Sequence, residues 1–554
     1  MRPIIALLKK YERIIIFIIC LTAVIFFLGS SLNPFDPRMF DFHDDTQAAR
    51  IQQFALNIKA GNIFPRVAPD LSFGLGFPVF NFYAPFSYWV TTGIHLIGIP
   101  IPIAIKTSFL LAIVSAFIAM YLFLKRFFSE EASLLGGAFY SSSIWFAIEI
   151  FVRGNLGEIW FLALFPLTLS VLHLHSEKLS RITFILGVLI LSALFTVHNV
   201  LSLISLIIIG SYILLLPHKK QLLSMFVLAL LLGSYFLIPA LLESHLTYAS
   251  YVAEKTNFHD HFLCLKQIWT APTWEFGGSG PGCDADTMPF VLGKIHIVLG
   301  LLGVSAFLLR FRREKKHRKI YSFIGIIGLV SLFLTLYPSS FIWNLFAPVF
   351  SLFQFPWRFL VFGSFFFAFF SGYLFNAIRI PFKKIVAFFF IGIILFTSSK
   401  YFSKPWLYST NEILLNLVSD KYIAQKAAYH MAEYLPKTAN YTFWRSFENA
   451  PLQTVKSSPF QKEYNGKLGE NLTLNIHYFP FWKVEINDKQ IIPSRFDQLG
   501  RPILSITEPS IVRVTYEQTT TEQLSNNITI ITFALLLCIL LYKPLWNKLR
   551  AILK

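Results

Sequence analysis

The sequence predicts a polytopic α-helical membrane protein that carries a small α+β domain near its C-terminal end. Three observations predict this class: 55% of the 554 residues are hydrophobic, only 14% are charged, and the apolar residues fall in blocks. Soluble proteins rarely combine so much apolar material with so little charge. The blocks approach the ~20 residues that a helix needs to cross a bilayer. We therefore expect the chain to cross a membrane many times.

About twelve helices are expected to span the membrane. The first begins after Lys9, Lys10 and Arg13, and no small-residue cleavage site follows it. We therefore interpret it as a retained anchor and not as a cleaved signal peptide. The predicted spans are 14–32, 103–124, 132–150, 158–176, 182–198, 200–216, 222–243, 294–309, 320–337, 358–376, 384–400 and 524–542.

Basic residues lie in short connectors between these spans, and they define a topology. Positive charge in alternate short loops marks the cytoplasmic side of a membrane protein, so both termini are predicted to be cytoplasmic. The same distribution accounts for the net charge of +18 and argues against a nucleic-acid partner. The connectors contain Lys9, Lys10 and Arg13; Lys125 and Arg126; Lys219 and Lys220; residues 310–319; Lys383 and Lys384; and Lys543, Lys548, Arg550 and Lys554.

This topology divides the chain into three parts. Residues 1–400 form the transmembrane part, with external loops at 33–102 and 244–293. Residues 401–523 form an external domain, and residues 524–554 contain the last span and a basic cytoplasmic tail.

The external domain shows the alternating apolar pattern of short strands. This alternation runs through Leu472, Trp482 and Val512 and their neighbours, and it predicts a small β-sandwich. Phe479, Phe481 and Trp482 are expected mainly in its core, with an aromatic surface for glycan as the alternative.

His43-Asp44-Asp45, in the first external loop, is the strongest candidate for a chemical centre. Carboxylates beside a bilayer are costly unless they are solvated or paired. Asp44-x-x-Gln47 has the form of a capping box, which is the structural alternative. A cap needs only one acid, so the second carboxylate and the imidazole favour a catalytic role for Asp44 and Asp45. His43 is then a substrate-binding residue.

A second polar group lies in the short turn between the predicted spans 132–150 and 158–176. It contains Glu149, Arg153 and Glu158. Charged residues at membrane depth are usually paired or functional. One interpretation is an ion pair that joins two helix ends. The other makes Arg153 a phosphate ligand, because a guanidinium binds phosphate oxygens in a bidentate way.

Further substrate-binding candidates lie at the external ends of other predicted segments. Each has a structural alternative, either as a helix-end residue or, for the arginine, as a side chain that snorkels toward water. These candidates are Asp70, His198, Asn199, Glu243 and Arg358.

The cysteines divide into two pairs by location. Cys20 and Cys538 lie inside apolar spans, whereas Cys264 and Cys283 share the loop 244–293. An external loop lies in an oxidising compartment, so Cys264 and Cys283 are predicted to form a disulfide.

Several short motifs resemble those of integral membrane glycosyltransferases of the GT-C superfamily. The chain is most similar to the bacterial membrane family labelled 6-pyruvoyl-tetrahydropterin synthase-related, and its tail, with Tyr478-Phe479-Pro480-x-Trp482, resembles that of YfhO-type membrane proteins. The motifs are Asp44-Asp45, Pro69-Asp70, Gly74-x-Gly76-x-Pro78-x-Phe80-Asn81-Phe82-Tyr83-x-Pro85, Arg153-Gly154-x-x-x-Glu158 and His198-Asn199.

The resemblance implies an enzyme of the bacterial inner (cytoplasmic) membrane. It would transfer a sugar from a polyprenyl-phosphate donor, surrounded by membrane lipids, to a glycan or lipid acceptor of the cell envelope on the outer face. One acid would be the general base, and Asp44 or Asp45 could instead bind Mg²⁺ or Mn²⁺. A lipid or polysaccharide transporter and a non-catalytic scaffold with a glycan-binding external domain are the alternatives. The donor sugar, the acceptor and the oligomeric state are not indicated.

Overall fold

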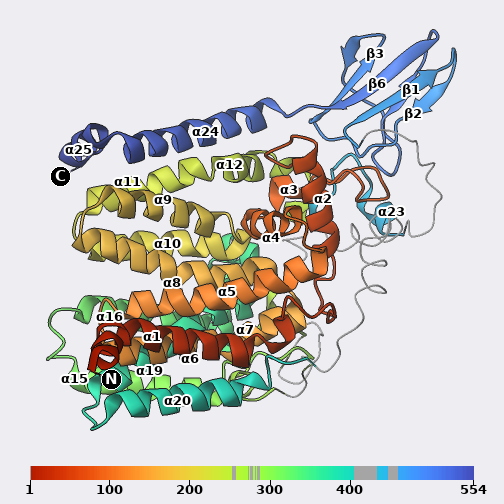
Figure 1. Ribbon diagram of the computed structural model, residues 1–554. Helices are drawn as coiled ribbons and strands as arrows, with labels where there is room; N and C mark the ends of the chain where they lie inside the picture. The colour runs from red at the N-terminus through yellow and green to blue at the C-terminus, as the bar shows by residue number, and fades with distance from the viewer. Residues whose placement is uncertain are drawn as a thin grey trace.

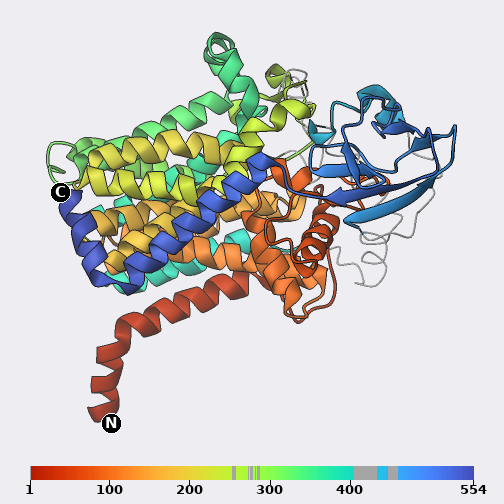
Figure 2. The ribbon, with the colours of Figure 1, turned by 90° about the horizontal axis from the view of Figure 1, so that it is seen from above.

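The long helices lie side by side in a bundle, and the strands gather at one end of it (Figure 1). The computed structural model describes residues 2–251, 257–271, 274, 279, 280, 282, 287–404, 433–446 and 459–553. Both chain termini lie at the end opposite the strands (Figures 1 and 2). We call these two ends the sheet end and the terminal end.

Helices occupy all the predicted spans. In the described part of the chain, seven stretches are long and apolar enough to cross a membrane. A helix pair bent by 68°, α11 with α12, adds an eighth if it forms one span. The chain is thus a multi-pass membrane protein by helix length and composition, and the count of about twelve stays a prediction. The helices are α1 (Arg2–Leu28), α5 (Ile101–Leu124), α6 (Glu130–Ser141) with α7 (Ile144–Ala147) and the π-helix η2 (Ile148–Arg153), α8 (Leu156–Glu177), α9 (Arg181–Phe195), α10 (Asn199–Leu215), α11 (Lys219–Leu232), α12 (Ser234–Leu242), α15 (Lys294–Arg310), α16 (Arg318–Thr335), α19 (Leu360–Ala377), α20 (Lys383–Ser399) and α24 (Thr520–Leu541).

Shorter helices and turns connect these elements. Three of them, α2 (Gln47–Lys59), α3 (Val79–Phe82) and α4 (Phe86–Leu96), belong to the first loop and lie at the sheet end (Figure 1). The others are α14 (Leu265–Trp269), α17 (Ser340–Leu345), α18 (Ala347–Phe350), α23 (Tyr441–Ser446) and α25 (Lys543–Ile552), with 3-10 turns η1 (Ser30–Leu32), η3 (Ser244–Leu246), η4 (Phe258–His261), η5 (Tyr337–Ser339), η6 (Ser351–Phe353) and η7 (Pro356–Phe359).

The phenylalanine-rich helix α19 lies at the centre of one half of the bundle. It packs against α6, α15 and α16. Glycines permit the close approach, because a Cβ built on Gly303 of α15 or on Gly328 of α16 would overlap atoms of α19. Small residues at helix interfaces let two backbones come together where no water drives association.

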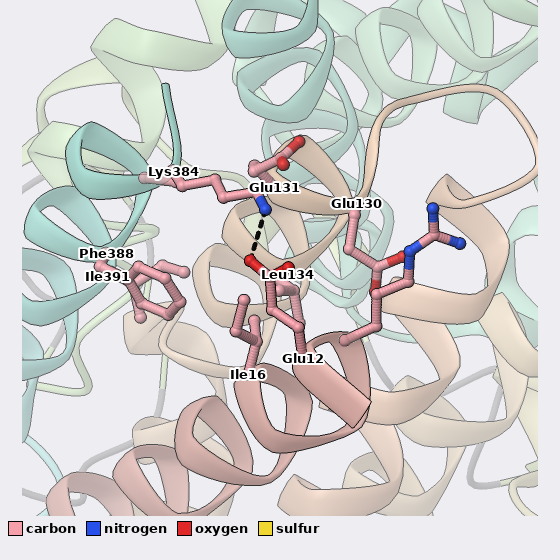
Figure 3. A pocket seen from close by; sticks show the side chains of 10 residues that line it. Glu12, Ile16, Glu130, Glu131, Leu134, Lys384, Phe388 and Ile391 are labelled. Carbon is pink, nitrogen blue, oxygen red and sulfur yellow. Dashed lines mark hydrogen bonds and ion pairs between the residues drawn. The ribbon is translucent and has the colours of Figure 1, made fainter. Parts of the chain in front are cut away.

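The basic connectors that indicated one side of the membrane meet at the terminal end. Lys384 Nζ lies 2.6 Å from Glu12 Oε1, an ion pair that joins α20 to α1 (Figure 3). The rings of Phe127 and His317, from two other connectors, have centroids 5.2 Å apart. The connectors therefore share one end of the bundle, as the charge pattern requires. Which side of a membrane this end faces stays a prediction.

The C-terminal strands form two antiparallel sheets. The larger has the order β1-β6-β3-β4, and the smaller pairs β2 with β5. Asn487 and Asp488, between β3 and β4, have φ of 48° and 63°, the left-handed pair that a tight hairpin needs. The predicted small sheet domain is thus confirmed. The strands are β1 (Gln461–Gly466), β2 (Asn471–Thr473), β3 (Trp482–Ile486), β4 (Lys489–Ile491), β5 (Ile503–Ser505) and β6 (Ser510–Tyr516).

The aromatic run before β3 belongs to the core of this domain. Phe479, Phe481 and Trp482 are only 1%, 1% and 2% exposed. The alternative of a glycan-binding surface at these residues is therefore wrong, because all three rings are buried.

The sheet domain docks on the glycine-rich turn of the first loop. His477 N donates to Leu75 O at 2.8 Å, and Ser72 Oγ is hydrogen-bonded to His477 Nε2. Lys462 Nζ donates to Gly74 O at 3.1 Å. This turn is therefore an interface with the sheet domain. Residues 405–432 and 447–458 of the predicted domain lie outside the described residues.

Cysteine pairing agrees with the prediction as far as the described residues reach. Cys264 is disulfide-bonded. Its predicted partner, Cys283, lies outside the described residues. Cys20 is free and buried, and Cys538 is free and exposed.

Candidate active site

Asp44 lies at the sheet end, just before α2. The N-cap of α2 is Thr46, and no side chain donates or accepts a capping hydrogen bond there. The capping-box interpretation of Asp44 and Gln47 is therefore wrong. The carboxylate of Asp44 instead lies 3.0 Å from His43 Nδ1, and its side chain remains 24% exposed.

Backbone hydrogen bonds tie this part of the first loop to the end of η2. His43 N donates to Val152 O at 3.0 Å, and Asp44 N donates to Arg153 O at 2.8 Å. Gly154, with φ of 70°, then reverses the chain in the left-handed conformation that favours glycine. The ring of Phe42 lies where a Cβ of residue 154 would be. Asp44 is thus fixed beside Arg153.

Arg153 is the last residue of η2 and pairs with two buried carboxylates. Its Nη1 lies 2.8 Å from both carboxylate oxygens of Glu149 and 2.8 Å from Glu158 Oε1. A π-helix is a rare conformation that often marks functional positions. Asn155 begins α8 by accepting a hydrogen bond from Glu158 N at 2.9 Å, which orients Glu158 toward Arg153.

Glu158 joins this pair to two further predicted residues. Its Oε1 lies 3.4 Å from His198 Nε2 and 3.6 Å from Arg358 Nε. The Arg358 guanidinium also donates to Phe353 O at 2.9 Å. The ring of Trp357 packs against Arg153, with 4.6 Å between guanidinium carbon and ring centroid. The structure thus brings together Arg153, Glu158, His198 and Arg358, which we call the arginine–glutamate cluster, with Asp44 at its edge.

The charges around Asp44 keep its carboxylate ionised. Burial alone would raise the pKa of this group. The hydrogen bond with His43 and the positive charges of Arg153 and Arg50 outweigh burial and hold the pKa below its ordinary value of 3.8. Asp45 follows it and is partly buried, and its backbone N–H donates to His43 O at 2.8 Å. Asp44 is therefore in the form that a general base requires at neutral pH.

Sequence reasoning missed a second arginine beside Asp44. Arg50, in α2, is only 5% exposed. Its Nη1 donates to Tyr88 Oη at 3.1 Å, and its guanidinium carbon lies 4.7 Å from the ring centroid of Tyr83. Tyr434, from the predicted external domain, packs edge-on against Tyr83 at 6.4 Å between ring centroids. The available signal was an arginine on a helix with one apolar face.

Lys404, which follows α20, was also missed. Its Nζ lies 3.0 Å from Asp41 Oδ1 and donates to Phe151 O at 2.9 Å. It therefore joins the loop that carries Asp44 to the π-helix that carries Arg153. A lysine four residues after a predicted span looks like an ordinary interfacial charge, so the sequence held no signal for this role.

Asp70 and Asn199 are placed outside the arginine–glutamate cluster. Asp70 Oδ2 accepts from Gln53 Nε2 at 2.8 Å, which braces the first loop. Asn199 Oδ1 accepts from Ala84 N at 2.9 Å, and its amide donates to Phe82 O at 2.6 Å. Both contacts hold the loop in shape.

Glu243 belongs to a second polar cluster, between α12, α3 and α24. Asn81 Nδ2 donates to Glu243 Oε2 at 2.9 Å and to Glu522 Oε1 at 2.7 Å. Thr519 donates to the other oxygen of Glu243 at 2.6 Å. Burial and the charge of Glu522 raise the pKa of Glu243 to about 7. Glu522 was missed, although an acid just before an apolar span is a signal for a buried polar partner.

The acids of the first loop have the donor chemistry for a hard cation, but few ligands. Within the described residues, no group of three or more His, Cys, Asp or Glu side chains is placed to hold a metal ion. Mg²⁺ is commonly bound by one or two carboxylates together with waters and substrate phosphates. Asp44 and Asp45 fit that smaller donor set.

Two cavities within the described residues lie away from Asp44. One, of about 340 Å³, lies at the terminal end between α1, α6 and α20 (Figure 3). The other, of about 790 Å³, lies between α15 and α20. Neither is lined by Asp44 or Arg153.

The solved structures of partial likeness include two archaeal oligosaccharyltransferase structures. No protein-family model and no curated protein sequence matches the chain. An oligosaccharyltransferase of Archaeoglobus fulgidus, tethered to an acceptor peptide containing the NVT sequon, has a TM-score of 0.42 and 11% identity over 72% of this chain and 56% of that one. The A. fulgidus oligosaccharyltransferase AglB, in complex with an inhibitory peptide and a dolichol-phosphate, has a TM-score of 0.42 and 13% identity over 72% of this chain and 57% of that one. The chain thus spans little more than half the length of the structures that it matches.

Proposed function

We propose that this chain is a membrane glycosyltransferase of the GT-C type. It moves a sugar from a polyprenyl-phosphate-linked donor to a glycan or lipid acceptor of the cell envelope, on the outer face of a bacterial inner membrane. The supporting observation is that Asp44 N donates to Arg153 O at 2.8 Å, which fixes an ionised acid beside buried arginines. The motifs of the first loop, of Arg153-Gly154-x-x-x-Glu158 and of His198-Asn199 resemble those of such enzymes.

Asp44 is the proposed general base. It takes the proton of the acceptor hydroxyl, whose oxygen forms a bond to the anomeric carbon of the sugar. The bond from that carbon to the phosphate oxygen breaks at the same time, and polyprenyl phosphate leaves with the electron pair. His43 orients the carboxylate through the 3.0 Å contact with Oδ1. A positioned general base typically contributes about 10²–10⁴-fold to the rate.

Arg153 and Arg358 are the proposed phosphate ligands. Arg153 contacts Glu149 and Glu158 through Nη1, so its Nε and Nη2 are the proposed donors to the phosphate. Arg358 shares Glu158 at 3.6 Å, so one buried acid holds both cations in place. Guanidinium groups bind phosphate oxygens through paired N–H donors, and they would neutralise the charge that develops on the leaving group. His198 sets the orientation of Glu158.

A divalent cation is a proposed addition to this site. Asp44 and Asp45 would hold Mg²⁺ or Mn²⁺ together with waters and substrate oxygens, and the ion would supply further charge neutralisation at the phosphate. Asp45 is then the ligand and Asp44 the base, although the two roles can be exchanged without changing the rest of the proposal.

Two other functions are less well supported by the geometry. A transporter would carry its charged residues near the middle of its spans, whereas Arg153, Glu158 and Arg358 lie at or next to helix ends on one side of the bundle. A scaffold would not need an ionised acid and two buried arginines at one point. Burial of Phe479, Phe481 and Trp482 also removes the aromatic glycan surface that favoured it.

The test is transfer by the purified full-length chain in liposomes. Synthetic polyprenyl-phosphate monosaccharides with a labelled sugar are supplied together with envelope glycans and lipids, and formation of labelled product is followed. The proposal requires product with the wild type and little product with Asp44→Asn at equal folded concentration. Equal product from both proteins would overturn it.

A further inference from the structure

The cavity of about 790 Å³ between α15 and α20 has an uneven distribution of charge and apolar surface. Among the described residues that line it, Lys294, at the start of α15, and Lys400, just after α20, carry a full charge, and none is an aspartate or glutamate. Within the described residues, neither lysine forms an ion pair. The cavity therefore concentrates positive charge.

Aromatic rings hold the two ammonium groups over the cavity. Lys294 Nζ lies 5.7 Å from the ring centroid of Trp269, and Lys400 Nζ lies 4.9 Å from that of Tyr401. Trp274 packs against Tyr401 with centroids 5.1 Å apart. Tryptophan and tyrosine are enriched at the level of lipid head groups. These rings thus mark the height at which a head group would lie.

Besides His296, Thr397 and Ser398, the cavity wall has apolar side chains, and these continue onto exposed helix faces. Val291, Ile295 and Ile394 line the cavity. Farther along the helices, Val298 of α15 is 43% exposed and Phe396 of α20 is 69% exposed. In a chain that crosses a membrane, such faces contact lipid tails. A ligand here would place an anionic group at the lysines and a hydrocarbon chain along α15 and α20.

We propose that this cavity binds an anionic phospholipid of the leaflet at the sheet end. Its phosphate head group lies between Lys294 and Lys400, and its acyl chains follow α15 and α20. The inference does not depend on the proposed glycosyltransferase activity.

The ligand is a bilayer phospholipid and not the sugar donor, because a wall of rings separates the cavity from the arginine–glutamate cluster. Trp145 packs against Trp357 at 6.1 Å between centroids, and Phe290 packs against Trp357 at 5.7 Å. Trp357 in turn packs on Arg153. A phosphate at Lys294 and Lys400 would therefore lie on the opposite side of these rings from Arg153.

The cavity at the terminal end provides the contrast. It is lined by Glu12, Glu130 and Glu131 as well as by Arg13 and Lys384, so its charges are mixed. Lys384 is already paired with Glu12 at 2.6 Å (Figure 3). Lys384→Ala therefore removes one lysine from a comparable cavity without touching the proposed lipid site, and it serves as the matched control.

The experiment measures lipid retention and thermal stability of the delipidated full-length protein in detergent. Phosphatidylglycerol, phosphatidylcholine, polyprenyl phosphate and inorganic phosphate are titrated separately, with native mass spectrometry and Tm as readouts. Wild type and Lys384→Ala should bind phosphatidylglycerol in preference to phosphatidylcholine. A lysine near a membrane surface adds enough attraction that each substitution to Ala should weaken binding about 5-fold, and the double variant Lys294→Ala/Lys400→Ala about 30-fold.

The outcomes separate the possible sources of the phosphate. Lys294→Arg/Lys400→Arg should restore binding, which shows that a weak double-alanine variant has lost charge and not its fold. Unchanged phosphatidylglycerol binding in the double-alanine variant would overturn the proposal, as would equal binding of phosphatidylcholine. Stabilisation by inorganic phosphate alone would indicate a free anion site. Selective loss of polyprenyl phosphate binding in Lys294→Ala/Lys400→Ala would assign the cavity to the sugar donor. Either the inorganic phosphate result or this polyprenyl phosphate result would also overturn the phospholipid proposal.

Discussion

Asp44 and Arg153 are far apart in the chain, yet the N–H of Asp44 donates to the carbonyl of Arg153 at 2.8 Å. The contact joins the first loop to the π-helix η2, and it places an ionised carboxylate next to a guanidinium that two other acids hold. The relative position of the two residues does not depend on a side-chain rotamer, because the hydrogen bond joins their backbones. The geometry is that of a preorganised site, in which charged groups keep their positions without substrate.

The first prediction concerns the carboxylate itself. Asp44→Asn should lower the transfer rate by about 10²–10⁴-fold, because a general base is lost. It should leave Tm nearly unchanged, since Asp44 does not cap α2. Rate and Tm are measured on the same purified protein. Asp36→Asn is the control, because Asp36 lies in the same loop but pairs with Arg38 at 2.7 Å. A fall in Tm with normal transfer would return Asp44 to a structural role.

The second prediction concerns the cation that Glu149 and Glu158 share. Arg153→Lys keeps the charge but cannot make the same paired contacts. Loss of a charge-assisted hydrogen bond costs about 1.5–3 kcal/mol, so binding of polyprenyl phosphate should weaken about 10–100-fold. Isothermal titration with polyprenyl monophosphate measures this change. Arg126→Lys is the control, since Arg126 pairs with Glu177 at 3.3 Å at the terminal end. Equal affinity of Arg153→Lys and wild type would remove Arg153 from the phosphate site.

The helices could be predicted from the sequence because an apolar block of sufficient length has few other folds beside a bilayer. Arg153, Glu158 and Arg358 could be singled out for a related reason, since a charge next to an apolar span demands a partner. The charge pattern placed them on one side of the membrane, and the structure brings them together at the sheet end. Their roles in transfer stay predictions.

Other parts of the site depend on which helices become neighbours, and the sequence pattern carries no such information. Arg50 lies beside Asp44 only because α2 packs over Tyr83 and Tyr88. Lys404 reaches Asp41 only because the chain after α20 returns to the first loop. Glu243 was assigned to the site from its position at a helix end, whereas the packing of α24 gives it Asn81 and Thr519 as partners.

The third prediction concerns the turn after η2. Gly154→Ala should lower the free energy of unfolding by more than about 1 kcal/mol, because its φ of 70° is unfavourable for alanine and its Cβ would overlap Phe42. Thermal unfolding in detergent checks this. Gly210→Ala is the control, since Gly210 lies within α10 with no atom within 4 Å of its Cβ position. That change should be neutral or slightly stabilising.

A double variant separates the two causes of strain at this turn. Gly154→Ala/Phe42→Ala removes the ring that the new Cβ would meet, but keeps the backbone conformation. Partial recovery of Tm relative to Gly154→Ala would show that the loop is held against η2 by this contact. If Gly154→Ala is as stable as wild type, the first loop does not pack on η2 as described.

The last prediction concerns pH and Glu243. Burial first, and then the charge of Glu522, raise the pKa of Glu243 from 4.5 to about 7 in the folded protein. The folded state therefore binds the proton more tightly than the unfolded state does. The resulting stabilisation is fully present below pH 4.5 and is lost as pH rises through about 7. The Tm of the purified protein should accordingly fall across this window.

Glu243→Gln should flatten this part of the Tm profile, because the amide cannot lose a proton and keeps an oxygen to accept from Asn81. Glu508→Gln, an exposed change in the sheet domain, should leave the profile as in the wild type. The contacts of Glu243 join α12 to the start of α24 through Thr519, so proteolysis between the sheet domain and α24 should become faster over the same pH range. A Tm that rises from pH 5 to pH 7, or a Glu243→Gln profile that matches the wild type, would show that this carboxyl is ionised in the folded protein.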